Sequence, residues 1–308
     1  MLLFGGRHLV NPRQKLISTI IRTAATKTTF NSTRTGNTVD IDEVKRFAQN
    51  FDYDFWWKSK EGEPLRSMNE LRVPLIRDSL VKQILKPLLS PTATPLSPTA
   101  TPLSPTVTEE SLCNKPLKGL KVLEVGSGGG LLCEPMARLG ASTTGIDPVP
   151  ENIDISLRHL RESSPELTDR LSYVCSSIED FAKVEKNVSS FDGLVASEVL
   201  EHVEDVDLFL ESGHKLIKPG GRLIITTINQ TFASQILAIS IAENILKIVP
   251  KGTHSYKKLI PLNGLVLLLR QLGFTVESIH GMTFNPFTGK WSWSSSTAIN
   301  FALVAVKL

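Results

Sequence analysis

The apolar positions of this 308-residue chain change their spacing along the sequence. From 40 to 57 they recur every three or four residues, which predicts a helix ending in the aromatic run Phe55-Trp56-Trp57. A second helix is predicted from about Asn69 to Leu85. Beyond it, Thr-Ala-Thr-Pro-Leu-Ser-Pro occurs twice, at 92–98 and 99–105. Prolines at this density predict an extended linker.

After this linker, short apolar runs alternate with amphipathic segments. The runs predict strands at 120–125, 142–146, 171–175, 191–197, 222–227, 275–279 and 298–306, and helices at 131–139, 153–160, 206–216 and 262–271. Strands separated by helices indicate an α/β fold whose parallel sheet is covered on both faces. We therefore expect a doubly wound, mostly parallel, seven-stranded sheet of the Rossmann type, with an antiparallel strand at its edge.

Charge is unevenly distributed and divides the chain further. Residues 1–39 hold six basic residues and no acidic one, which leaves 28 basic against 31 acidic residues in the rest. The net charge of +3 is therefore a property of the leader and does not indicate a nucleic-acid-binding face. A leader rich in Arg, Ser and Thr with an apolar helical face predicts a mitochondrial transit peptide cleaved between 22 and 38; a disordered basic tail is the alternative. We expect a leader at 1–38, a helical segment at 39–89, a linker at 90–112 and the α/β domain at 113–308.

The cysteines and the apolar runs exclude several protein classes. Cys113, Cys133 and Cys175 are widely spaced and form no Cys-x-x-Cys pair, which excludes a disulfide scaffold and a cysteine zinc site. No uncharged apolar run reaches the roughly 18 residues that span a bilayer.

A glycine-rich turn follows the first predicted strand of the α/β domain. Gly126, Gly128 and Gly130 allow a sharp turn, and the N–H groups of the following helix favour a polar ligand. In the dinucleotide fingerprint the third glycine would stand at Leu131, so this spacing favours a nucleoside without a pyrophosphate over NAD. Asp147, at the end of the next strand, has the carboxylate that ribose hydroxyls need. A glycine turn without a ligand is the alternative.

An acidic–histidine cluster follows the fourth strand of the domain. Glu198, Glu201 and His202 are spaced i, i+3 and i+4, so one helical turn would present all three on one side. Two carboxylates and an imidazole suit a divalent cation such as magnesium or manganese. A solvated acidic turn, with His202 as a cap or a lone base, is the alternative.

Several of these segments together resemble class I S-adenosylmethionine-dependent methyltransferases. They are 122–130, 145–148, 196–203, 216–221 and 226–229. Three more specific segments, Met68–Pro74, Val249–His254 and Thr283–Phe287, are similar to the ubiquinone-biosynthesis O-methyltransferases in their mitochondrial form. The resemblance covers roughly 40–308, and it departs at the proline-rich repeat and at Ser127, where cysteine is common.

The resemblance implies a site and a reaction. It places the S-adenosylmethionine contacts at Arg72, Gly126, Asp147 and Ser197, and the Mg²⁺ ligands at Glu198, Glu201 and His202. It implies methyl transfer to catechol-type hydroxyls of polyprenylated benzoate and quinol intermediates of coenzyme Q biosynthesis. A metal-free mechanism would use His202 or His254 as the base. A non-catalytic, cofactor-binding scaffold in a lipid-biosynthetic assembly stays open as an alternative.

A prenylated substrate also raises the question of membrane access. Residues 232–249 are strongly apolar, with Glu243 and Lys247 as their charges, and Lys251, Lys257 and Lys258 follow. This pattern fits an interfacial helix on anionic lipid and equally a core helix covering the sheet. The resemblance implies peripheral association with the matrix side of the mitochondrial inner membrane and membership of a multi-subunit coenzyme Q complex.

Overall fold

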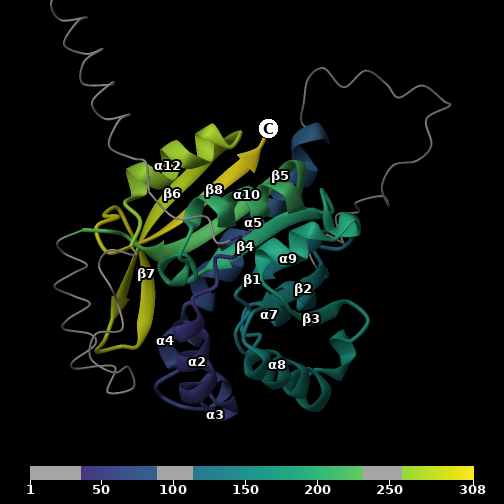
Figure 1. The fold of residues 1–308 in the computed structure, drawn as a ribbon, viewed down its shortest axis with the longest axis vertical. Coiled ribbons are helices and arrows are strands. Elements are labelled where there is room, and N and C mark those ends of the chain that lie inside the picture. The colour runs from purple at the N-terminus through teal and green to yellow at the C-terminus, as the bar shows by residue number, and fades with distance from the viewer. Residues whose placement is uncertain (1–35, 89–113, 232–258) are drawn as a thin grey trace, which may run out of the picture. The chain divides into compact units, whose positions relative to one another are not determined.

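A computed structural model of the chain describes residues 36–88, 114–231 and 259–308 (Figure 1). Residues 1–35, 89–113 and 232–258 lie outside the described residues, and they include most of the leader predicted at 1–38 and all of the linker predicted at 90–112. The expectations for the transit peptide, the linker, the interfacial helix and His254 therefore concern parts of the chain on which the structure is silent. The described residues belong to one compact unit, Gly36–Leu308.

The centre of this unit is a mixed sheet. The described residues contribute eight strands: β1 Lys121–Val125, β2 Ser142–Asp147, β3 Leu171–Cys175, β4 Phe191–Ser197, β5 Ile217–Ile228, β6 Phe274–Asn285, β7 Lys290–Ser294 and β8 Asn300–Lys307. Their order is β3-β2-β1-β4-β5-β8-β6-β7 (Figure 1). The first five of these are parallel neighbours, and β8 is antiparallel to both β5 and β6.

The prediction of a doubly wound, mostly parallel sheet is confirmed. The predicted number of seven strands is one too few, because the described sheet has eight. The extra strand is β7, which pairs antiparallel with β6 in a hairpin, with Phe284 opposite Trp291. The alternation of Trp with Ser and Lys in β7 is too short to stand out as a strand by itself. It becomes one because β6 continues as far as Asn285 and offers it a partner.

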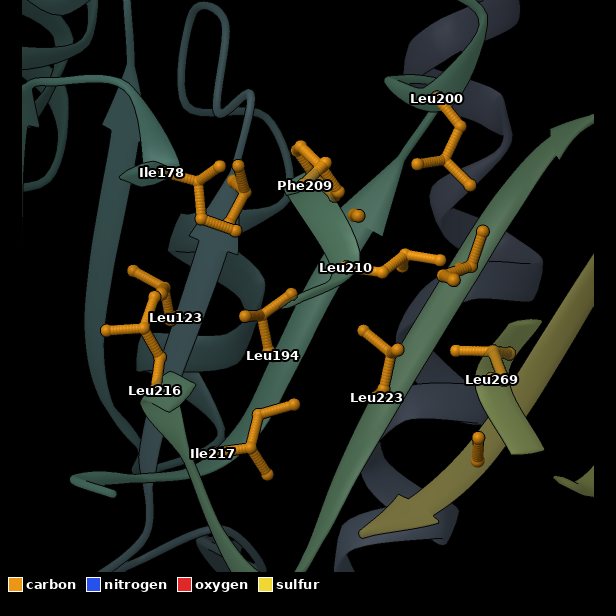
Figure 2. Packing of buried hydrophobic residues seen from close by; sticks show 14 of the residues in the cluster. Leu123, Ile178, Leu194, Leu200, Phe209, Leu210, Leu216, Ile217, Leu223 and Leu269 are labelled. Atoms are coloured by element: carbon orange, nitrogen blue, oxygen red, sulfur yellow. The ribbon is translucent and has the colours of Figure 1, made fainter. Parts of the chain in front are cut away.

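Helices cover both faces of the sheet because successive strand residues point to opposite sides. On one face Leu123, Leu194 and Leu223 meet α9 (Ile178–Lys183), α10 (Val206–Leu216) and α12 (Leu262–Gln271), and Figure 2 shows this packing. On the other face their neighbours in sequence, Val122, Val195 and Ile224, pack in one cluster with side chains of α5 (Asn69–Leu88) and α7 (Cys133–Arg138). There α8 (Pro150–Ser163) packs near β3. Short 3-10 turns lie at Pro165–Leu167, Glu185–Asn187 and Leu200–His202.

The N-terminal segment differs from the single helix predicted for 40–57. It forms α2 (Ile41–Asn50) and α3 (Tyr53–Trp57), and α4 (Glu63–Ser67) follows. The helix is interrupted at Phe51 and Asp52, because the Asp52 carboxylate accepts the Phe55 N–H at 2.8 Å and so caps a new helix. The interruption lets α2 and α3 contact different strand ends: Phe47 of α2 packs on His202, after β4, and Trp56 of α3 packs on Gly128, after β1.

No helix in the described ranges is long and apolar enough to span a membrane.

Candidate active site

The glycine turn lies where β1 ends, beside β4, at the point where the order of the parallel strands reverses. Ligands of doubly wound sheets bind at such points. Gly126 and Gly128 have φ of +71° and +52°, a left-handed conformation that favours glycine. A Cβ on Gly128 would lie 2.4 Å from the Trp56 ring, so the turn also needs glycine for the close approach of α3. The turn and α3 thus form two walls of one site.

Asp147 ties this turn to β2. One carboxylate oxygen accepts the Gly128 N–H at 2.9 Å, and the other accepts the Val149 N–H at 2.9 Å and the Asn152 side-chain amide at 3.3 Å. Burial raises the pKa of Asp147, and these three hydrogen bonds act against that increase because they favour the charged form. The residue is thus held in one orientation beside the glycine turn.

Arg72 enters the site from α5. Its guanidinium donates to Ser197 Oγ at 2.8 Å, although the two residues lie 125 positions apart, and Ser197 in turn shares a 2.7 Å hydrogen bond with Thr226 Oγ1. Burial lowers the pKa of Arg72, while Glu124 and Glu198 oppose this by favouring its charge. A buried cation is therefore set between the end of β1 and the end of β4.

These residues line one cavity of about 370 Å³. Arg72, Gly126, Asp147 and Ser197, the cofactor contacts implied by the resemblance, all lie along it. Another part of the lining is aromatic and comes from the N-terminal helices; it consists of Phe47, Phe51, Phe55 and Trp56. The cavity therefore has a polar end at the glycine turn and an apolar side under α2 and α3.

Several buried polar atoms on the cavity wall have no hydrogen-bond partner among the residues that the structure describes. They are Trp56 Nε1, Glu124 Oε2, Ser127 Oγ and Asn152 Oδ1. Buried polar groups in proteins are nearly always paired, so donors and acceptors left open on a cavity wall fit a polar ligand. Burial raises the pKa of Glu124 to about 7. A ligand with cationic and hydroxyl groups, such as S-adenosylmethionine, suits these residues.

The acidic–histidine cluster is built differently from the helical turn that the spacing predicts. Leu200–His202 forms a 3-10 turn, but Glu198 lies outside it in the left-handed region, with φ of +56°. Glu198 accepts a hydrogen bond from Thr226 Oγ1 at 2.8 Å, and Glu201 accepts one from Thr227 Oγ1 at 2.7 Å. The prediction of one shared helical face is therefore wrong, because β5 holds each carboxylate separately.

Electrostatics nevertheless couple the three side chains of this cluster. Burial and then repulsion by Glu201 raise the pKa of Glu198. Burial alone would lower the pKa of His202, but Glu43, Glu201 and Glu198 outweigh it and raise the pKa. Glu198 and His202 are among the residues that line the cavity, and Glu201 is not. Within the described ranges, no three His, Cys, Asp or Glu side chains are arranged to hold a metal ion.

Sequence reasoning missed several residues of the site. Glu124 had a visible signal, since an acid inside an apolar strand next to a glycine turn is unusual. The aromatic wall and Glu43 gave no sequence signal of a site, because their helical spacing is equally typical of an ordinary packed helix.

Comparison with known proteins identifies the class. A family model described as a methyltransferase domain matches residues 97–279. A mitochondrial ubiquinone biosynthesis O-methyltransferase of Rattus norvegicus is 42% identical over 273 residues, which cover 89% of this chain and 71% of that protein. Its counterpart in Homo sapiens is 44% identical over 88% of this chain and 66% of its own length. A ubiquinone biosynthesis O-methyltransferase of Azorhizobium caulinodans is 35% identical over 87% and 93%.

The doubly wound sheet, the site at its strand ends and the matching family model define a class I S-adenosylmethionine-dependent methyltransferase. Within that class, the chain belongs to the ubiquinone biosynthesis O-methyltransferase family. The resemblance seen in the sequence is thereby confirmed.

Proposed function

We propose that this enzyme transfers a methyl group from S-adenosylmethionine to a catechol-type hydroxyl of polyprenylated benzoate and quinol intermediates in coenzyme Q biosynthesis. The observation that carries the proposal is the two-sided cavity, in which a polar nucleoside end adjoins an aromatic wall and an acidic–histidine cluster. The names of the relatives support the substrate class.

The polar end suits the cofactor. Asp147 would accept the ribose hydroxyls, and the backbone from Gly126 would lie close to the nucleoside. Arg72 and Ser197, held to each other at 2.8 Å, would shape the end of the cavity that receives the methionine part. Glu124 would be ionised by a cationic ligand group, which favours the charged carboxylate.

Methyl transfer is an in-line displacement in which a C–O bond forms as the C–S bond breaks, leaving S-adenosylhomocysteine. The enzyme chiefly aligns the oxygen, the methyl group and the sulfur. The aromatic wall would hold the substrate ring and exclude water. The hydroxyl proton must leave, and His202 on the cavity wall would accept it at a ring nitrogen in a metal-free reaction. His254, the other candidate base, lies outside the described residues.

We also propose that Glu198, Glu201 and His202 hold a divalent cation, with Mg²⁺ as the first choice. The donor chemistry fits, because repulsion between two nearby carboxylates leaves negative charge for a cation to neutralise. Each carboxylate uses one oxygen for a threonine hydroxyl, so the Thr226 and Thr227 partners would orient the ligands. When bound, the cation would lower the pKa of the substrate hydroxyl and fix its oxygen.

Location and assembly follow the same proposal. Two of the relatives reported above are mitochondrial proteins by name. Together with the basic leader, this supports a mitochondrial enzyme that works peripherally at the matrix side of the inner membrane, as part of a multi-subunit coenzyme Q complex. Liposome flotation of wild type and an Ile241→Asp/Ile245→Asp variant tests whether 232–249 contributes to the attachment.

The test is turnover of a short-chain catechol analogue with S-adenosylmethionine, followed by mass spectrometry with and without a chelator. We expect a methylated product that chelation and Glu198→Ala/Glu201→Ala both suppress. Glu185→Ala/Glu204→Ala removes the same charge from two exposed positions and is the matched control. Calorimetry with S-adenosylmethionine verifies that the variants fold. Cofactor binding without product would favour the scaffold, and turnover unaffected by either treatment would exclude the metal.

A further inference from the structure

Helix α2 carries two adjacent acids in different surroundings. The Asp42 side chain is 87% exposed and pairs at 3.8 Å with Lys45, whereas the Glu43 side chain is 8% exposed and lines the cavity. An acid is rarely buried unless it is paired, so the position of Glu43 needs a reason. The helical spacing of α2 does not by itself require an acid at this buried position.

Glu43 is in contact with the acidic–histidine cluster. Its Oε2 lies 3.4 Å from His202 Nδ1. Arg46, one turn further along α2, donates to both Glu43 oxygens at 3.1 and 3.2 Å. Phe47 meets the His202 ring edge-on, with 5.2 Å between the ring centroids. One face of α2 therefore holds His202 through a carboxylate and an aromatic ring, spaced i and i+4.

The chain before α2 fixes the helix against the same turn. Val39 forms an antiparallel bridge with Val203, and the Thr38 carbonyl accepts the Glu204 N–H at 3.1 Å. Thr38 Oγ1 also donates to Glu179 at 2.6 Å in a buried contact. The backbone directly after His202 is thus tied to the backbone directly before α2. The backbone on both sides of the contact therefore fixes the distance between Glu43 and His202.

We propose that Glu43 is a positioning residue that holds the His202 imidazole by Nδ1 and so directs Nε2 to its far side. Neutral imidazole exists as two tautomers, and a carboxylate at Nδ1 selects the one protonated there. Carboxylates that orient a histidine in this way affect the metal affinity or the catalytic activity of the site to which the histidine belongs. The inference rests on the proposed function, because it assigns a role to α2 in the same reaction.

A structural role for Glu43 is the competing explanation. Its ion pair with Arg46 could simply stabilise α2, as i, i+3 pairs on helices do. The two explanations differ in what they predict for His202. A purely structural Glu43 leaves the imidazole unaffected as long as α2 stays folded. A positioning Glu43 changes the imidazole even where α2 stays folded.

The experiment compares Glu43→Gln with Asp42→Asn, the same charge change one residue away on the solvent side. Nitrogen NMR of the His202 ring in the full chain, at a pH where imidazole is neutral, reports the tautomer directly. We expect Glu43→Gln to shift His202 toward the Nε2-protonated form, and Asp42→Asn to leave it as in wild type. Titration with Mn²⁺ alone should show affinity about 10- to 100-fold weaker in Glu43→Gln.

Kinetics complete the test. We expect kcat of Glu43→Gln to fall by about 10- to 100-fold while S-adenosylmethionine affinity stays within about twofold of wild type. A His202 signal that Glu43→Gln leaves unchanged, or that Asp42→Asn alters equally, overturns the proposal. So does a parallel loss of cofactor affinity, which indicates a displaced helix. If wild type lacks turnover, the proposed function fails, while the NMR comparison still decides whether Glu43 orients His202.

Discussion

Two buried acids of the site, Glu124 and Asp147, differ in how many hydrogen-bond donors surround them. Glu124 is 4% exposed at the end of β1 and has an unpartnered oxygen on the cavity wall. Asp147 is equally buried, but three donors surround its carboxylate. The contrast is informative, because a buried acid with fewer donors keeps a proton more tightly than a buried acid with more of them. Glu124 is thus one of the residues through which pH acts on the unliganded protein.

The first prediction concerns this pH dependence. Burial raises the pKa of Glu124 from 4.5 to about 7, so between these values the folded protein binds a proton that the unfolded chain releases. The free energy of unfolding therefore falls as the pH rises through this window. At about 1.4 kcal/mol for each pH unit, the loss reaches on the order of 3 kcal/mol. Glu124→Gln, which carries no such proton, should not show it.

Denaturant unfolding of both proteins across this range, without cofactor, measures the difference. Wild type should lose stability relative to Glu124→Gln as the pH rises. Stability curves that stay parallel would contradict the assignment.

Among the elements, the paired helices α2 and α3 both contribute to the cavity. They supply its aromatic wall, and α3 is fastened to the glycine turn by a 3.1 Å hydrogen bond from Trp57 Nε1 to the Gly129 carbonyl. The Trp57 ring also stacks on His159 of α8 with 3.4 Å between centroids. The break between α2 and α3 lets the two helices reach different turns. One continuous helix could not place Glu43 beside His202, after β4, and Trp57 beside Gly129, after β1.

Gly129→Ala tests this arrangement at its closest contact. Gly129 has no left-handed φ, but its Cβ would lie 2.4 Å from Trp56 Cγ, so alanine must displace the indole. We expect S-adenosylmethionine affinity to fall at least about tenfold and stability to fall by about 1–3 kcal/mol, the usual cost of overpacking. Calorimetry and tryptophan fluorescence measure the two effects.

Gly213→Ala in α10 is the matched control. Its new Cβ would meet Leu194 Cδ1 at an ordinary 3.4 Å. It should bind cofactor like wild type. Unchanged affinity in Gly129→Ala would mean that α3 does not shape the cofactor site.

On the scale of the whole molecule, every described residue that lines the cavity belongs to the unit Gly36–Leu308. Its walls come from strands in the middle of the sheet and from helices at the start of that unit. We therefore predict that a chain starting at Gly36 binds S-adenosylmethionine as tightly as the full chain. A chain starting at Asp52 lacks Glu43, Phe47 and the bridge at Val39, and it should bind more weakly and lose methyl transfer.

Calorimetry of the two truncated proteins beside the full chain decides this. Loss of binding in the chain that starts at Gly36 would show that residues 1–35 contribute to the site. Full activity in the chain that starts at Asp52 would remove α2 from the mechanism.

Much of the fold was predictable because its signals are local. Apolar runs bounded by glycine and proline marked the first five strands to within a few residues, except that β5 begins earlier than expected, and they predicted the helical cover of the sheet. The glycine turn, Asp147 and the cluster at 198–202 were visible because they stand where strands end. The eighth strand and the break at Phe51 were not, since both depend on partners supplied by other segments.

The sequence by itself therefore determined the class of protein, the order of its elements and the strand ends that carry its chemistry. These follow from periodicity, from glycine's conformational freedom and from charged residues in apolar surroundings, all of which are properties of neighbouring residues. Only the tertiary structure decided that Arg72 meets Ser197 and that Glu43 meets His202. Such contacts arise when distant elements pack on a common sheet, and no local pattern encodes which side chains then face each other.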